Sequence, residues 1–208
     1  MADVKRVGPC HAFLGNPTVA GGTGMRYLGH TRGDVTVAPG INIAFGRADQ
    51  RGRTPLADGV YTVGPTPVVS LPLLDEEREK IRDCVPGSVL TTGGGETALG
   101  FGSGFARIAL AAIPTLILLP VDQVTQGTNG INADDMVVLP AAIARDIGQF
   151  TFNLPDGEDV FSPHEVQFAG LLRDADQGAA AIPAAHRAIF YGPPLALGLT
   201  WFLPTATP

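Results

Sequence analysis

The fold is decided by one continuous stretch, YLGHTRGDVTVAPGINIAFGRADQRGRTPLADGVYTVGPTPVVSLPLLDEEREKIRDCVPG, which spans residues 27–87. Its runs of apolar and β-branched residues predict strands at 34–37, 41–45, 60–63 and 67–73. Pro39-Gly40 falls between the first two runs and predicts a bend or bulge. The sequence GRADQRGRTP makes 46–55 a polar loop. This stretch therefore predicts paired strands, joined by a long basic loop.

A short helix follows these strands, in the sequence DEEREKIRDCV at about 75–85. Asp75 is a favourable N-cap, and the acids Glu76 and Glu77 lie in the first turn, where the helix dipole stabilises negative charge. The Pro-Gly pair immediately after the helix ends it. Its apolar stripe is narrow, so we expect the helix to pack on a sheet edge or face.

The rest of the chain predicts further strands near 115–119, 136–139, 148–152 and 166–171, with a last one within 195–203. The 27 Gly and 18 Pro of the 208 residues indicate many turns and loops. Gly-rich sequence at 1–26 predicts an N-terminal arm rather than a core element, and at 91–104 it predicts a mobile assembly loop. We expect a single mainly β domain over residues 1–208, a β-sandwich or barrel with one flanking α-helix.

The composition argues against several classes of protein. Hydrophobic residues make up 45% of the chain and charged residues 16%, which argues against general disorder. Cys10 and Cys84 form no CxxC pair, so neither a disulfide framework nor a structural zinc site is expected. Residues 1–6 lack the apolar segment of a signal peptide. The most apolar span, 108–121, contains two prolines and is too short for a membrane helix, so it predicts a buried strand.

Charge is unevenly distributed along the chain, whose net charge is −6. Residues 1–53 carry seven basic and three acidic side chains, or +4, whereas 122–176 carry two basic and ten acidic ones, or −8. Such a division suits electrostatic complementarity between neighbouring copies, although a solvated surface without a partner explains it equally well. Arg outnumbers Lys by 12 to 2, which favours contacts over open solvent because Arg tolerates burial in interfaces.

Three short patterns resemble catalytic or ligand-binding motifs. The glycines at 93–95 are not followed by the Lys of a phosphate-binding loop. Cys10 and His11 are adjacent, and neighbours on a strand point to opposite faces, so they do not pair as nucleophile and base. The acidic sequence LPDGEDVFSPHE (154–165) lacks EF-hand spacing and favours a turn with a solvated loop. We therefore expect no catalytic residues, no metal and no cofactor.

A series of segments continues beyond the 27–87 stretch: IPTLILLP (113–120), DMVVLP (135–140), GQFTFNLPDGED (148–159), HEVQFAGLLRDAD (164–176) and IPAAHRAIFYGPP (182–194). The order and kind of these segments resemble the major tail tube proteins of long-tailed bacteriophages, whose fold family includes type VI secretion tubes. The resemblance covers most of the chain. It departs from the family in the Gly-rich 91–104 segment and in the long N-terminal arm.

This resemblance implies a virion structural protein rather than an enzyme. Subunits would form hexameric rings that stack into a hollow conduit for DNA ejection, and their sheets would join edge to edge into an inner barrel. The protein would assemble in the host cytoplasm and reside in the virion tail, without inserting into a membrane. Its partners would be itself, the tape-measure protein, the tail-tip or baseplate proteins and the tail-terminator protein, with transient, non-specific passage of DNA.

The resemblance also implies roles for named residues. The 46–55 loop would reach the next ring, and its contacts would come from Arg47, Asp49, Arg51 and Arg53. An acidic lumen would repel DNA phosphates and let the genome slide. The candidates for that lining are Asp134, Asp135, Asp146 and Asp156.

Two other interpretations stay open. One is another particle component, such as a head decoration or tail-completion protein, which would share the β content without polymerising alone. The other is a soluble metal-dependent enzyme that uses the acids of 156–165. The basic loop and the uneven charge favour self-assembly over both.

Overall fold

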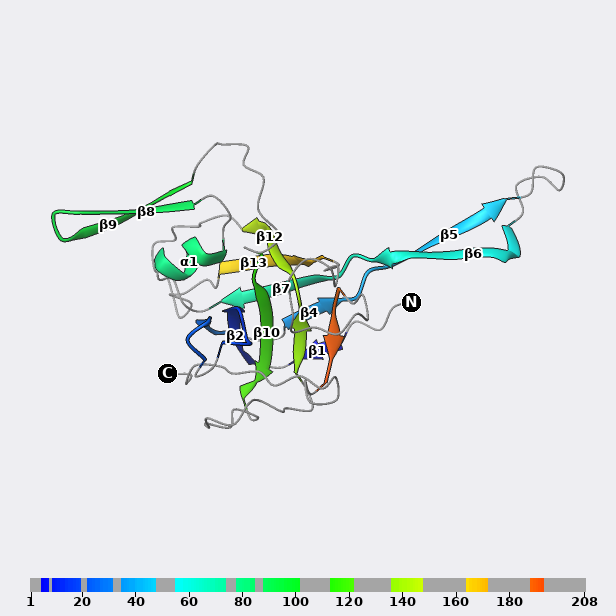
Figure 1. Cartoon of the computed structure of the whole chain (residues 1–208), viewed down its shortest axis with the longest axis horizontal. Helices are drawn as coiled ribbons and strands as arrows, with labels where there is room; N and C mark the ends of the chain where they lie inside the picture. Colours follow the sequence, from blue (N-terminus) through cyan, green and yellow to red (C-terminus); the bar gives the residue numbers. More distant parts are fainter. Residues whose placement is uncertain are drawn as a thin grey trace, which may run out of the picture.

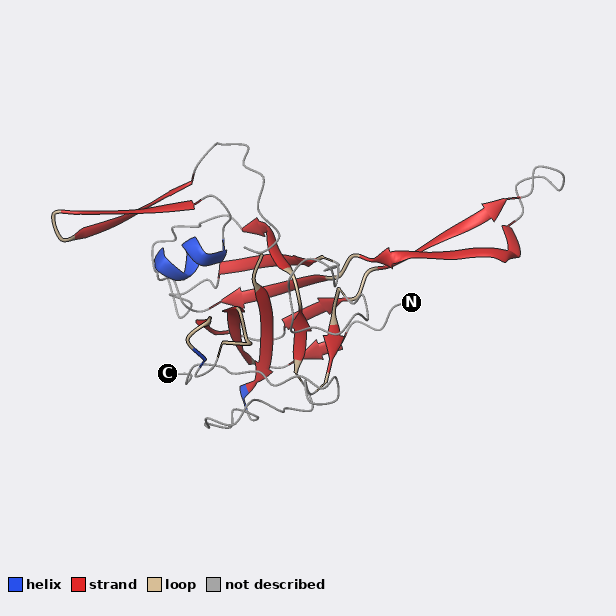
Figure 2. Ribbon diagram, in the orientation of Figure 1, coloured by secondary structure: helices blue, strands red, loops and turns tan. Residues whose placement is uncertain are grey.

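The structure is a computed structural model, and it describes residues 5–7, 9–19, 22–31, 35–47, 55–73, 78–84, 88–101, 113–121, 136–147, 164–171 and 188–192. Within these ranges the chain is mainly β, and the elements are antiparallel strands with one short α-helix (Figure 2). The mainly β class predicted from the sequence is therefore confirmed. No helix of the described ranges is long and apolar enough to cross a membrane.

Two five-stranded antiparallel sheets form the body of the molecule (Figure 1). The first sheet has the strand order β1 (Lys5–Val7), β4 (Val35–Ala38), β7 (Val68–Leu73), β13 (His164–Gly170) and β12 (Ala142–Ile147). The second has the order β14 (Phe190–Tyr191), β11 (Val137–Leu139), β10 (Thr115–Pro120), β2 (Cys10–Gly15) and β3 (Met25–His30). An isolated bridge between Thr31 and Leu73 connects the two sheets, and the described strands do not close into a barrel.

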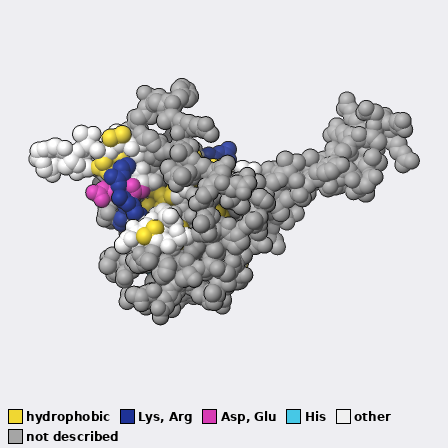
Figure 3. Space-filling model, in the orientation of Figure 1, with side chains coloured by type: hydrophobic (Ala, Val, Ile, Leu, Met, Phe, Trp, Pro, Cys, Tyr) yellow, Lys and Arg dark blue, Asp and Glu magenta, His cyan; other side chains and the backbone are white. Residues whose placement is uncertain are grey.

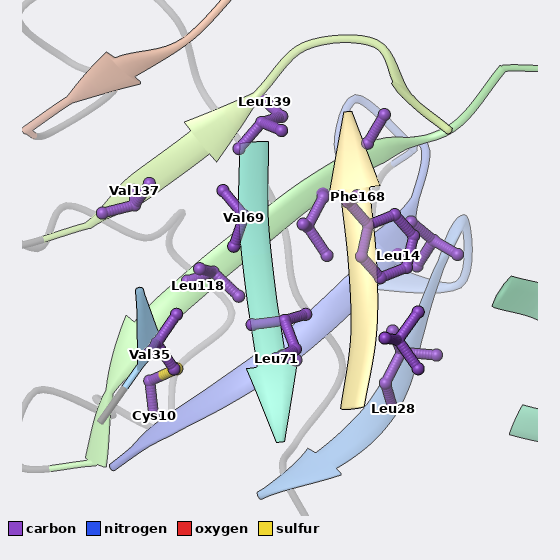
Figure 4. Packing of buried hydrophobic residues seen from close by; sticks show 14 of the residues in the cluster. Cys10, Leu14, Leu28, Val35, Val69, Leu71, Leu118, Val137, Leu139 and Phe168 are labelled. Carbon is purple, nitrogen blue, oxygen red and sulfur yellow. The ribbon is translucent and has the colours of Figure 1, made fainter. Parts of the chain in front are cut away.

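One hydrophobic cluster draws its side chains from both sheets (Figure 4). Val69 and Leu71 of β7 and Phe168 of β13 enter it from the first sheet, and Leu118 of β10 and Leu14 of β2 enter it from the second. Alternate residues of β7 are buried and half-buried, the period of two expected for a strand with one face on the core. The sequence VVSLPL has this period because only one side of the first sheet faces the core.

The inner strands of the second sheet are buried on both faces. Leu116 and Leu118 of β10 belong to the core cluster, and Ile117 between them, which points to the opposite face, is also fully buried. Its cross-strand neighbours Phe13 and Val138 are buried as well. Strands buried on both faces have continuous apolar runs, so the sequence TLILLP lacks alternation and was correctly predicted as a buried strand.

The N-terminal segment corrects the sequence-based prediction. Residues 1–26 were expected to be an arm, yet β2 (Cys10–Gly15) is an inner strand of the second sheet, between β10 and β3. Ala12 and Phe13 are almost completely buried in it. The five residues CHAFL form a short apolar run between turn signals, the pattern of a buried strand. The surrounding glycines and prolines concealed that pattern because they mark tight turns, not an extended arm.

Most other predicted elements are present. Helix α1 (Arg78–Cys84) lies inside the predicted 75–85, and β10, β11 and β13 lie at the predicted 115–119, 136–139 and 166–171. The predicted strands at 148–152 and 195–203 fall outside the described residues. β12 and β14 were not predicted, since the β12 sequence AIARDI does not alternate apolar and polar residues regularly, and β14 has only two residues.

Candidate assembly surfaces

A long hairpin, β5–β6, projects from one end of the body (Figure 1). β5 (Ile41–Arg47) pairs with β6 (Pro55–Pro65), from Ile41 opposite Pro65 at the base to Arg47 opposite Pro55 toward the tip. At about 3.3 Å per residue, the 11 residues of β6 would span roughly 35 Å if fully extended. The two strands form a sheet of their own, with no third described strand beside them.

The base of this hairpin is a tight turn of the backbone. Gly40 has a φ of 61°, and the amide of Thr66 donates a hydrogen bond of 2.9 Å to the Gly40 carbonyl. A Cβ atom on Gly40 would lie 2.1 Å from the Thr66 carbonyl oxygen, so only glycine fits here. The predicted bend at Pro39-Gly40 is thus the point at which the chain leaves the first sheet and enters the hairpin.

The predicted polar loop at 46–55 is corrected at both of its ends. Gly46 and Arg47 belong to β5, and Pro55 begins β6, because the hairpin ladder extends farther than the apolar residues do. Of the predicted inter-ring residues, Arg47 therefore lies at the outer end of β5. Asp49, Arg51 and Arg53 lie outside the described residues, and their role stays a prediction.

A second hairpin projects from the opposite side of the body (Figure 1). β8 (Ser88–Gly93) and β9 (Glu96–Phe101) pair without a register shift, from Ser88 opposite Phe101 to Gly93 opposite Glu96. Gly94 and Gly95 form the turn with φ angles of 63° and 85°, the positive values that a two-residue hairpin turn requires. The prediction of a mobile loop at 91–104 is therefore wrong over 91–101, where the glycines make a turn; 102–104 lie outside the described residues.

One face of the β8–β9 hairpin is exposed and carries small, uncharged residues. Val89 is 58% exposed, and Thr91, Ala98 and Gly100 on the same face are exposed too. Glu96 at the tip is the single charged residue of the sequences SVLTTG and ETALGF. Figure 3 shows this projection as mostly white atoms, while the basic and acidic side chains of the described surface gather beside it. The hairpin therefore presents backbone and small side chains, with little charge.

Helix α1 anchors the base of the β8–β9 hairpin. The Ser88 hydroxyl donates a hydrogen bond of 2.9 Å to the carbonyl oxygen of Arg82 in the last turn of the helix. Asp83 accepts hydrogen bonds from Arg82 and from Arg26 of strand β3, both within salt-bridge distance. The Lys80 ammonium lies 5.8 Å from the centroid of the Tyr27 ring. These contacts hold the helix beside β3, the outer strand of the second sheet, and the narrow apolar stripe predicted packing on either a sheet edge or a sheet face.

The outer edges of the two body sheets are short or irregular. β1 has three residues and β14 has two. β12 carries a bulge at Arg145, since Ala144 pairs with Phe168 and Asp146 with the adjacent Gln167. β3 carries a similar bulge at Leu28. Short strands, bulges and charges are the features by which natural sheets avoid edge-to-edge association.

The hairpins differ from the body in this respect. β6 is irregular, because its register shifts twice against β5 and the extra residues all lie on β6. β5 has no such insertion, and neither do β8 and β9. None of these three strands contains proline. Among the described strands, the regular outer edges of sheets are therefore all in the hairpins.

A cluster of aromatic and imidazole rings covers the outer face of β2 and β3. His11 Nδ1 and the Tyr27 hydroxyl are 2.8 Å apart, and the rings of His11 and His30 have centroids 4.2 Å apart. Phe13 packs against Tyr27 at 5.2 Å. Burial lowers the pKa of His11, and the nearby His30 lowers it further. This arrangement disfavours the charged form of His11, whose ring packs against those of Tyr27 and His30.

The two cysteines, Cys10 and Cys84, are buried free thiols. Cys10 faces the core cluster, and its amide and sulfur both contact the Thr31 hydroxyl. Burial raises the pKa of Cys10 to about 11, although the hydrogen bond to Thr31 lowers it. Burial also raises the pKa of Cys84 to about 12, with a smaller contribution from the Asp83 carboxylate. Both thiols are therefore protonated and poorly reactive at neutral pH.

The predicted acidic residues are only partly placed. Asp146 lies in β12, next to the bulge at Arg145. Asp134, Asp135 and Asp156 lie outside the described residues, so the four are not placed relative to one another. Of the 154–165 sequence, the structure describes His164 and Glu165, at the start of β13. In the described part of the chain, no three His, Cys, Asp or Glu side chains are close enough to hold a metal ion.

Comparisons with known proteins found neither a matching family model nor a curated relative.

The residues that the structure adds to the candidate surfaces are those of β5, β8 and β9. A signal for the second hairpin was present in the sequence, since Gly94-Gly95 separates two runs of β-forming residues. The density of glycine at 93–104 hid it.

Proposed function

We propose that this protein is a self-assembling structural subunit, the major tail tube protein of a phage-type tail. The observation that carries the proposal is the pair of hairpins that project from opposite sides of a mainly β body (Figure 1). An isolated two-stranded hairpin is marginally stable in water. Projections of this kind therefore gain stability from contacts with other molecules, which is what an assembly subunit provides.

The position of the hairpins favours a repeating assembly. Surfaces on opposite sides of one subunit make head-to-tail contacts, and these generate closed rings or extended fibres rather than simple dimers. A tube of stacked rings combines both outcomes. In this proposal the body is a β-sandwich of the two sheets that share one core, with α1 at its flank, as the resemblance to tail tube proteins implies.

The proposal assigns the subunit contacts differently from the sequence-based expectation. There, sheets of neighbouring subunits joined edge to edge into an inner barrel, without a choice between the body and the hairpins. The described body edges are short or bulged, whereas β5, β8 and β9 of the hairpins have no inserted residue. We therefore assign the main contacts to the hairpins, with Arg47 and the loop beyond it directed toward a neighbouring ring.

The tube would serve as a conduit for DNA. A chain with a net charge of −6 and ten acids within 122–176 can line a passage that repels phosphates. Asp134, Asp135, Asp146 and Asp156 remain the candidates for that lining. The tape-measure protein would fill the tube before ejection, and the tail-tip and tail-terminator proteins would bound its two ends.

The test is to express the chain and examine it by negative-stain electron microscopy together with light scattering. We expect rings or hollow tubes, formed alone or after addition of purified tail-tip components as initiator. A matched variant replaces residues 42–64 with Asn-Gly, which can join Ile41 to Pro65 because these residues are paired at the hairpin base. This variant should fold and remain monomeric. A wild-type chain that stays monomeric at high concentration with the tail-tip components present would contradict the proposal.

A further inference from the structure

We infer that strand β5 of one copy pairs with strand β8 of a second copy, so that the two hairpins form one four-stranded sheet between molecules. The inference deepens the proposed function, since it rests on self-assembly and names the surfaces that meet. It starts from the hydrogen-bonding groups of the backbone. In the described part of the chain each hairpin is a two-stranded sheet, and a strand with no described strand on one side presents a row of N–H and C=O groups there.

The sequence of these edges suits pairing with another strand. β8 reads SVLTTG and β5 reads INIAFGR, so neither contains the proline that would remove a donor. β8 carries no charge, and β5 carries one, Arg47, at its outer end. Charges and bulges along an edge are the usual protection against association, and they are present on the body strands β3 and β12 instead.

The second copy is required by the shape of the molecule. The β5–β6 and β8–β9 hairpins point away from opposite sides of the body, so the two edges of one chain cannot meet (Figure 1). When two copies approach tip-first, the left-hand projection of one lies along the right-hand projection of the other. Each hairpin then gives the other a neighbouring strand, and the same contact can repeat from copy to copy.

The direction of the strands selects β8 over β9. β5 runs outward from the body to its tip at Arg47, and β8 runs outward from Ser88 to the turn at Gly94. In two copies that approach tip-first, two outward strands run antiparallel, whereas β5 and β9 would run parallel. Antiparallel pairing is the more stable of the two, and every described pair of strands in this chain is antiparallel. β5 and β8 are also of similar length, with seven and six residues.

Disulfide cross-linking between separate copies tests this pairing. One population carries Ala44→Cys in the middle of β5, and the other carries Val89→Cys or Thr91→Cys in β8, two positions that cover alternative registers. The matched controls are Gly100→Cys and Ala98→Cys, the cross-strand partners of these residues on β9, on the same exposed face. The native Cys10 and Cys84 can stay in place because both are buried.

The expected result is a mixed dimer that forms through β8 about tenfold faster or more than through β9, because pairing holds the two thiols at an effective concentration in the millimolar range. Equal rates through the two strands, or a preference for β9, would overturn the inference. Tubes that form without this cross-link would overturn it too, while leaving the proposed function intact. If no tubes form, the same mixtures are oxidised at high concentration: a dimer through β8 supports the pairing, and its absence refutes it.

Discussion

At the scale of single residues, burial separates the side chains that hold the body together from those of the hairpin surface. Phe168 is 1% exposed in the core cluster, whereas Val89 is 58% exposed on β8. We expect Phe168→Ala to lower the free energy of unfolding by about 3–5 kcal/mol, through lost apolar contact and the cavity left behind. Val89→Ala should change it by about 0.5 kcal/mol or less. Urea unfolding of the monomer measures both, and a similar loss in the two variants would contradict this picture of the core.

The same reasoning gives a pH dependence for His11. Its pKa lies below the ordinary 6.5 because burial, and then His30, disfavours the charged ring. Below that pH the unfolded chain therefore binds more protons than the folded protein, so the free energy of unfolding falls as the pH drops below about 6.5. The ring has Tyr27 and His30 as neighbours, and Lys80 lies beyond the Tyr27 ring.

The variant His11→Gln separates this effect from the titration of other groups. It removes the buried imidazole, so the loss of stability between pH 7.5 and pH 5.5 should be smaller than in the wild type. The measurement is urea unfolding at both pH values. An undiminished loss in the variant would show that His11 does not contribute to the pH dependence.

At the scale of elements, the sequence predicted best those strands whose residue pattern is set by burial alone. β7 was recognisable because apolar residues alternate along a strand that has one buried face. β10 was recognisable because a strand that is buried on both faces has a continuous apolar run. β2 was missed because its apolar run is short and lies between segments that contain glycine and proline. The β8–β9 hairpin was taken for a loop because glycine serves flexible segments and tight turns alike, and φ angles decide between them.

The candidate surfaces were less predictable than the elements. The sequence identified Arg47 and the bend at Pro39-Gly40, since polarity and proline are local features. It could not identify β5 and β8 as the outer strands of two-stranded sheets among the described strands, because an edge is defined by which strands pair elsewhere in the chain. The bulges at Leu28 and Arg145 depend on the register between distant strands, and no local pattern reports it.

Two glycines with the same backbone conformation allow a test of the hairpin base. Gly40 and Gly94 have φ angles of 61° and 63°, but a Cβ atom on Gly40 would meet the Thr66 carbonyl at 2.1 Å, whereas Gly94 has open space. Gly94→Ala should cost about 1–2 kcal/mol from the left-handed conformation alone. Gly40→Ala adds a backbone clash and should cost more, with loss of the hydrogen bond from Thr66. Thermal unfolding and hydrogen exchange at Thr66 measure this, and equal effects of the two substitutions would contradict the described turn.

At the scale of the whole molecule, the proposed assembly would grow head to tail, because its two contact surfaces differ and lie on opposite sides of the subunit. A chain that lacks the β5–β6 hairpin, with Asn-Gly in place of 42–64, keeps β8 and can still join the end of an assembly that presents β5. It offers no β5 to the next subunit, so growth stops there. We therefore expect this variant to shorten tubes when it is a small fraction of the protein, and mean tube length in electron micrographs measures the effect. The matched control lacks the β8–β9 hairpin as well as the β5–β6 hairpin, so it cannot join an assembly and should leave tube length unchanged. Inhibition by the control, or a loss of assembly only in proportion to the variant added, would show that the subunits do not join head to tail.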